Sequence, residues 1–114
     1  MKDLTFHPPL QYSAFLHLLD EAPFHLVSFS RAGCTASTIL RERISPLAGE
    51  QPVRLIHLEV GIHELIARHF EVKETPALLL FQGRKPVWRQ TGMTDASCVK
   101  FILSSYIDQG VPQL

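Results

Sequence analysis

The sequence has no net charge and no long apolar run. Eleven basic and eleven acidic residues balance within 114, so no overall field would hold nucleic acid or an anionic membrane surface. No apolar segment approaches the roughly 18 residues of a membrane-spanning helix, and the N-terminus lacks the apolar stretch of a signal peptide. We therefore expect a soluble, cytoplasmic protein that binds neither nucleic acid nor membranes.

Cysteine is also scarce, with Cys34 and Cys98 alone in the chain. Two cysteines are too few for a disulfide scaffold, and a reducing compartment suits both. The six histidines are scattered, none lies within four residues of a cysteine, and no H-x-x-x-H pair occurs. We expect no metal site and no resident cofactor.

Apolar side chains are present in sufficient number, 46% of the chain, to form the core of one domain over residues 1–114. Apolar spacing predicts strands and helices in the order strand, helix, strand, helix, strand, helix, strand, strand, helix. Pro46 either bends or ends the second helix, Thr94 or Asp95 caps the last one, and the tail 108–114 is expected to be mobile. The strands are expected at 4–6 (closed by the "HPP" that follows), 24–29, 53–60, 77–82 and 86–91, and the helices at 10–19, from 34 to about 47, at 62–70 and from about 95.

This order predicts an α/β fold with a mixed central sheet flanked by helices on both faces. Strands that alternate with helices imply parallel crossovers, while Gly83 allows a tight turn that makes 77–91 an antiparallel hairpin. In such sheets a ligand site tends to lie beyond the carboxyl end of a central strand. The segment "SRAGCTAS", 30–37, is expected at such an end.

Cys34 lies where the second helix should begin. At or next to the N-cap, its sulfur can accept hydrogen bonds from the backbone N–H groups of Ala36 and Ser37, and it lies at the positive end of the helix dipole. The Ser37 hydroxyl and the charge of Arg31 can favour the thiolate further. The alternative is a small, buried and inert thiol. We favour a reactive Cys34 because its polar and small neighbours form no apolar pattern.

Two stretches, "FHLVSFSRAGCTAS" and "VKETPALLLFQGRKPVWRQTGM", resemble the thioredoxin family, and the resemblance extends from about Leu4 to Ile107. It implies the thioredoxin fold, with Pro76 cis and facing Cys34. Thr75 would offer backbone groups to an extended substrate, and Gly92 would leave room beside the site. Substrate contacts are expected from Gly33, Thr35 and Ala36 as well.

The chain departs from the family motif Trp-Cys-Gly-Pro-Cys. Ser37 replaces the second, resolving cysteine, and Ser28 stands where the family usually has a buried aspartate. His57 takes the place of a lysine near that aspartate, and Ser30 that of a common tryptophan. Glu42 replaces a proline that often bends the helix. In dithiol members of the family the acid is thought to help deprotonate the second thiol. The absence of the acid is therefore consistent with the absence of that thiol.

The resemblance implies a monothiol protein of thiol–disulfide exchange and cell redox homeostasis. Cys34 would form mixed disulfides with protein clients, with Ser37 stabilising its thiolate and an external thiol such as glutathione resolving the product. Two alternatives stay open: a degenerate fold that serves as a protein-binding module, and a glutathione or iron–sulfur protein similar to monothiol glutaredoxins. A monomer is expected, with Cys98 on an outer surface away from Cys34 and Trp88 in hairpin packing.

Overall fold

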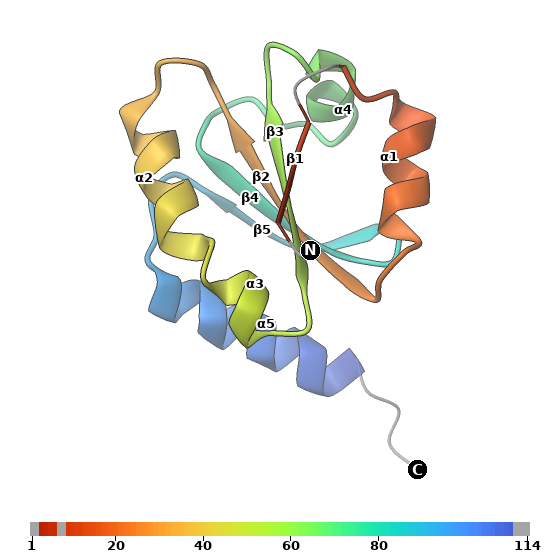
Figure 1. The fold of residues 1–114 in the computed structure, drawn as a ribbon, viewed down its shortest axis with the longest axis vertical. Coiled ribbons are helices and arrows are strands. Elements are labelled where there is room, and N and C mark those ends of the chain that lie inside the picture. The colour runs from red at the N-terminus through yellow and green to blue at the C-terminus, as the bar shows by residue number, and fades with distance from the viewer. Residues whose placement is uncertain (1–2, 7–8, 111–114) are drawn as a thin grey trace.

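Five strands form one mixed sheet at the centre of the computed structural model, which describes residues 3–6 and 9–110 (Figure 1). The strand order is β1-β3-β2-β4-β5. Strands β1, β3 and β2 are parallel, whereas β4 runs antiparallel to both β2 and β5. The predicted α/β class and mixed sheet are confirmed. The strands are β1 Asp3–Thr5, β2 Phe24–Ser30, β3 Arg54–Glu59, β4 Ala77–Gln82 and β5 Lys85–Thr91.

Helices cover both faces of the sheet. Figure 1 shows α1 and α4 on one side, and α2, α3 and α5 on the other. Residues 108–110, which were expected in the tail, belong to the last helix. Residues 111–114, and residues 7–8 at the predicted end of the first strand, lie outside the described part of the chain. The helices are α1 Tyr12–Leu19, α2 Thr35–Ile44, α3 Leu47–Glu50, α4 Glu64–His69 and α5 Ala96–Gly110.

The helix ends show what Pro46 does after the second helix and which residue caps the last one. Helix α2 ends at Ile44, and Pro46 is the N-cap of the short α3, so the proline separates two helices rather than bending one. At the start of α5, the Asp95 Oδ1 atom accepts a hydrogen bond of 2.8 Å from the backbone N–H of Cys98. Asp95 is therefore the cap, because a carboxylate here satisfies a free amide and complements the helix dipole.

Strand β4 runs antiparallel to β2, whereas the alternation of strands and helices predicted a parallel crossover. Helix α4 has six residues and is about 9 Å long, whereas a six-residue strand such as β3 spans about 20 Å. Helix α4 alone does not return the chain along the sheet, although the whole connection, residues 60–76, has the length that a crossover needs. Strand β4 instead starts at the edge where β3 ends, and it pairs antiparallel with β2.

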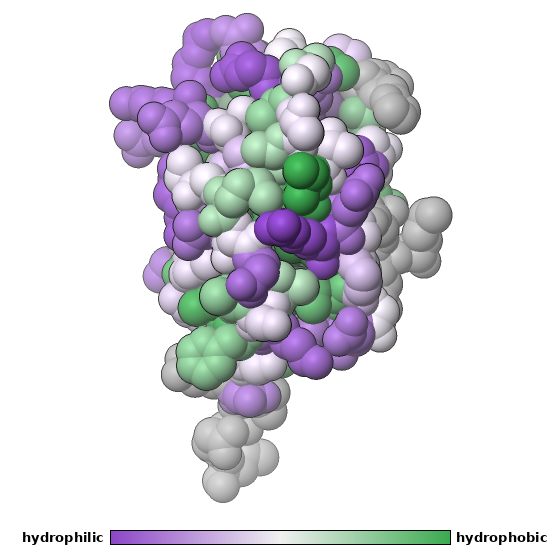
Figure 2. Space-filling model, turned by 90° about the vertical axis from the view of Figure 1, so that its left-hand side faces the viewer, coloured by the Kyte–Doolittle hydropathy of each residue, from purple (hydrophilic) through white to green (hydrophobic). Residues whose placement is uncertain are grey.

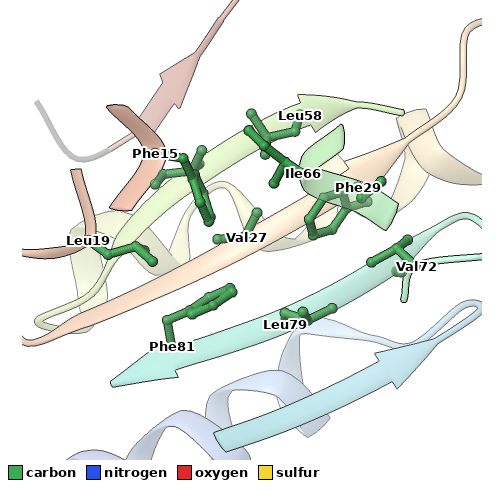
Figure 3. Packing of buried hydrophobic residues seen from close by; sticks show 12 residues of the cluster. Phe15, Leu19, Val27, Phe29, Leu58, Ile66, Val72, Leu79 and Phe81 are labelled. Atoms are coloured by element: carbon green, nitrogen blue, oxygen red, sulfur yellow. The ribbon is translucent and has the colours of Figure 1, made fainter. Parts of the chain in front are cut away.

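Each face of the sheet has its own apolar core. Strand β2 contributes to both, since Val27 and Phe29 face α1 and α4 while Leu26 faces α2 and α5. The first cluster, on the side of α1 and α4, is drawn in Figure 3, where its side chains pack between the sheet and the helices. Burial of each large apolar side chain contributes about 1.5–3 kcal/mol, so the central strand is held from both sides. The labelled members of the first cluster are Phe15, Leu19, Val27, Phe29, Leu58, Ile66, Val72, Leu79 and Phe81.

A histidine is buried at the start of the central strand. His25 has no exposed surface, and neither ring nitrogen has a hydrogen-bond partner among the described residues. Burial, and to a smaller extent Arg54, lower the pKa of His25 from 6.5 to about 4 against the opposite effect of Glu21. His25 is therefore neutral in the folded protein at neutral pH.

We predict that His25 makes the fold sensitive to acid. An unfolded histidine takes up a proton near pH 6.5, whereas the folded His25 resists protonation until about pH 4. The free energy of unfolding should therefore fall between these values, by about 2 kcal/mol after allowance for solvent screening. Urea unfolding at pH 7.5 and pH 5 measures the change, and His25→Phe should remove it. His17→Gln, at an exposed helix position, is the control. An identical pH slope in the wild type and His25→Phe would contradict the prediction.

Candidate active site at Cys34

Cys34 lies just beyond the carboxyl end of the central strand β2, as expected. Residues 31–33 form a turn in which the Cys34 N–H donates to the Arg31 carbonyl over 3.1 Å. Gly33 has a φ of +77°, and a Cβ built there would meet no atom within 4 Å, so glycine is required for its backbone conformation and not for space. Cys34 itself is the N-cap of α2, with extended backbone angles and a half-buried side chain.

The pKa of the Cys34 thiol is lowered from its ordinary value by uncharged donors. The Ser37 hydroxyl has the largest effect, the backbone N–H groups of Ser37 and Ala36 add to it, and the Thr75 side chain contributes last. Partial burial of the sulfur acts in the opposite direction. Arg31 is not among the groups that lower this pKa, so the contribution expected from its charge is absent. The helix start therefore favours a thiolate without an ion pair.

Ser37 is buried beneath the first turn of α2, with 3% of its surface exposed. Its hydroxyl oxygen has no hydrogen-bond partner of regular geometry among the described residues. The effect of Ser37 on the Cys34 sulfur is consequently a short-range electrostatic one, and the hydroxyl hydrogen is available to turn toward the thiolate. Thr35 beside it is exposed, and Ala36 is half-buried.

The second part of the site comes from the segment before β4 and the end of β5. The Thr75–Pro76 peptide bond is cis, and the Gly92 N–H donates to the Pro76 carbonyl over 2.8 Å. Gly92 has a φ of +89° and open space around its missing Cβ, so its backbone conformation explains the glycine. Pro76 is buried while Thr75 is half-buried. Of the pair, Thr75 is the residue open to a substrate.

Two polar residues lie under α2 in place of a charged pair. Ser28 and His57 are neighbours in the register of β2 and β3, and both are buried, with 3% and 4% of their surfaces exposed. Neither contributes a carboxylate near the sulfur. Ser30, at the end of β2, opens into a hollow of about 220 Å³ whose walls include Arg41 and Glu59. The surroundings behind Cys34 are therefore polar, and neither Ser28 nor His57 supplies a carboxylate.

Cys98 lies elsewhere, in the first turn of α5, and both cysteines are free thiols. Its exposed side chain lines a groove of about 460 Å³ between β5 and α5, together with Trp88 and Phe101. Trp88 also packs against the second apolar cluster, as hairpin packing requires. Figure 2 shows the α2 and α5 side of the molecule, where apolar residues are dispersed in small groups among hydrophilic ones.

Sequence reasoning did not single out two arginines that support the site. The Arg43 Nη1 atom in α2 donates to the Thr94 carbonyl over 3.4 Å, and Arg89 in β5 binds carbonyls at the end of α4. These contacts join residues 18 to 51 positions apart, so no local pattern reveals them. Over residues 3–6 and 9–110, no helix is long and apolar enough to span a membrane, and no three His, Cys, Asp or Glu side chains form a metal site.

Comparison with solved structures identifies the fold. A mutant thioredoxin from Halobacterium salinarum NRC-1 superposes with a TM-score of 0.84 at 20% identity, over 92% of this chain and 90% of that one. Thioredoxin from Schistosoma mansoni gives 0.81 at 12% identity, over 93% and 99%. Mitochondrial thioredoxin 3 from Saccharomyces cerevisiae gives 0.75 at 14% identity, over 92% of each chain.

These similarities extend over nearly the whole chain, while the sequence identities are low. No family model and no curated protein matches the sequence. The strand order and the helices on both faces are thus those of a thioredoxin fold. The chain adopts the thioredoxin fold.

Proposed function

We propose that the protein is a monothiol member of the thioredoxin-like proteins that takes part in thiol–disulfide exchange. The observation that carries the proposal is the position of Cys34 as the N-cap of α2, where neutral donors lower its pKa. A half-buried thiolate at the carboxyl end of the central strand is accessible and nucleophilic. Cys98 lies in the first turn of α5, where its backbone N–H binds the Asp95 carboxylate.

The exchange proceeds in two substitutions at sulfur. The Cys34 thiolate attacks one sulfur of a client disulfide, the client S–S bond breaks, and the departing client sulfur leaves as a thiolate that takes up a proton from water. A mixed disulfide now joins Cys34 to the client. The thiolate of an external thiol, such as glutathione, then attacks the client sulfur of this bond, forms a new disulfide with the client, and releases Cys34 as its thiolate. Ser37 stabilises the thiolate as reactant in the first step and as leaving group in the second.

A lone thiol restricts the reaction to isomerisation, deglutathionylation or retention of clients. With serine at position 37, Cys34 has no internal partner to release the client and carry the disulfide away. Turnover therefore depends on the external thiol pool, and a reducing compartment such as the cytoplasm would supply it. Rapid reduction coupled to a disulfide reductase does not fit this arrangement.

Protein clients would bind beside Thr75. In this proposal the backbone of Thr75 pairs with an extended client segment, as an added strand would, and presents the client sulfur to Cys34. Gly33 and the first two residues of α2, Thr35 and Ala36, would form the opposite rim. The exposed Lys73 and Glu74 would contact the client next to the pair.

A second candidate is a binding module without redox chemistry. The observation that favours it is that Ser28 and Ser37, both buried, occupy the positions of the acid and the second thiol. In this reading the surface around Thr75 recruits a protein and Cys34 takes no part. The two candidates differ in whether Cys34 is required.

The first test of this proposed function measures the pKa of Cys34. In Cys98→Ser protein, the rate of Cys34 alkylation should reach half its maximum at a pH below that of an ordinary thiol. Ser37→Ala should move this midpoint to higher pH, since the largest stabilising group is removed. Ser45→Ala is the matched control, because its hydroxyl bonds to a carbonyl at the other end of α2. A midpoint at the ordinary thiol value would favour the binding module.

The second prediction concerns client capture. Incubation with glutathionylated or disulfide-bonded proteins should yield mixed disulfides with the wild type and with Cys98→Ser, and none with Cys34→Ser. Because Cys34 is half-buried at a helix start, serine should leave the fold intact, which circular dichroism verifies. Equal capture by Cys34→Ser would remove this thiol from the mechanism.

A third prediction restores the missing partner. Ser37→Cys places a second thiol one turn from Cys34, and it should confer weak reduction of insulin disulfides by dithiothreitol-regenerated protein. We expect a rate above that of the wild type, yet small, because Ser28 cannot deprotonate the new thiol as an acid at that position would. No gain in a folded variant would mean that Ser28, Ser30 or Gly33 also prevents the exchange.

A further inference from the structure

The segment that carries Thr75 leaves helix α4 through a left-handed residue. Glu71 has a φ of +56° and is the only non-glycine residue with positive φ in the described part of the chain. Its N–H donates to the Arg68 carbonyl over 3.1 Å, and the N–H of Val72 donates to the Ala67 carbonyl over 2.8 Å. This pattern normally ends a helix with glycine at the left-handed position. A glutamate there is strained and needs support from elsewhere.

That support comes from β5. The Arg89 Nη1 atom donates to the Glu71 carbonyl over 3.0 Å, and its Nη2 atom donates to the Phe70 carbonyl. Arg89 pairs with Leu79 in the β4–β5 register, and Leu79 belongs to the cluster under α1 and α4. The guanidinium thus lies at the carboxyl end of α4, where a cation complements the helix dipole. It binds main-chain groups, so its effect is on the path of the chain.

The residue that follows β5 holds the same segment a second time, at the segment's other end. The Gly92 N–H, three residues after Arg89, donates to the carbonyl of Pro76. Between the two attachments, Val72 is buried in the first cluster, while Lys73 and Glu74 are exposed. The position of Thr75 relative to Cys34 consequently depends on both attachments, because nothing buried holds residues 73 and 74.

We propose that Arg89 is a positioning residue of the Cys34 site: by binding the carbonyls of Phe70 and Glu71 it fixes the segment that places Thr75 beside the sulfur. It touches neither the sulfur nor a client. The inference deepens the function proposed above and rests on it for its second measurement. The first measurement, on the thiol alone, is independent of any client.

The thiol measurement uses Cys98→Ser protein and follows the alkylation of Cys34 against pH. Arg89→Ala should move the midpoint to higher pH, because the Thr75 side chain is one of the groups that stabilise the thiolate. Arg89→Lys keeps a cation at the end of α4 and should recover part of the shift. Thr75→Val should cause a similar shift, and its effect should not add to that of Arg89→Ala. An unchanged midpoint in Arg89→Ala, or fully additive shifts, would overturn the proposal.

The client measurement follows the rate at which Cys34 captures a peptide that carries a mixed disulfide with glutathione. Arg89→Ala should slow capture about two- to tenfold, the range expected when one hydrogen-bonded attachment is lost. Arg84→Ala is the control, since Arg84 lies in the turn of the same hairpin and its side chain bonds to Asp20. Equal slowing by Arg84→Ala would show a general effect on the hairpin and contradict the proposal.

The outcomes separate this inference from the proposed function. If Arg89→Ala does not fold, Arg89→Gln retains amide donors in place of the guanidinium and provides the same two readouts. A midpoint shift without any capture by wild-type protein would support the positioning role and reject thiol–disulfide exchange. Capture that requires Cys34 and is unaffected by Arg89 would leave the proposed function intact and reject the inference.

Discussion

The antiparallel pairing of β4 with β2 is the constraint on which the site depends. In this register Phe29, near the end of β2, lies opposite Ala77, the first residue of β4. Cys34 follows Phe29 after a short turn, and Pro76 directly precedes Ala77. Two segments about forty residues apart are thereby brought to one edge of the sheet. A shift of one residue would turn every side chain of β4 to the opposite face, and the two apolar cores oppose it.

The chemistry at that edge relies on dipoles and not on charges. Ser37, two backbone N–H groups and Thr75 stabilise the Cys34 thiolate, and the effect of burial is smaller than their sum. Interactions of this kind act over short distances and are screened little by salt, whereas an exposed arginine such as Arg31 would be screened strongly. Small movements of Ser37 or Thr75 therefore matter more for this thiol than the charge of its surroundings.

Much of this architecture could be predicted from local sequence, and the remainder could not for identifiable reasons. The apolar run before Gly33 and the polar residues after it place Cys34 at a helix start, which the structure confirms. The direction of β4 was not predicted, because the connection 60–76 is long enough for either a parallel or an antiparallel strand. Thr94 and Asp95 are equally good caps by composition, and the structure decides for Asp95. The role of Arg89 could not be predicted from any local pattern, because the carbonyls that it binds are 18 and 19 residues away in the sequence.

The presence of serine at both position 28 and position 37 has a physical explanation. A buried carboxylate at position 28 would carry a desolvation cost of several kcal/mol unless a neighbour shared its proton or its charge. A thiol at position 37 could exchange such a proton, but the serine hydroxyl cannot, since it does not ionise near neutral pH. With Ser37 in place, an acid at position 28 would only weaken the fold and repel the Cys34 thiolate. A serine at position 28 avoids both effects, so the two serines are consistent with the monothiol exchange that we propose for Cys34.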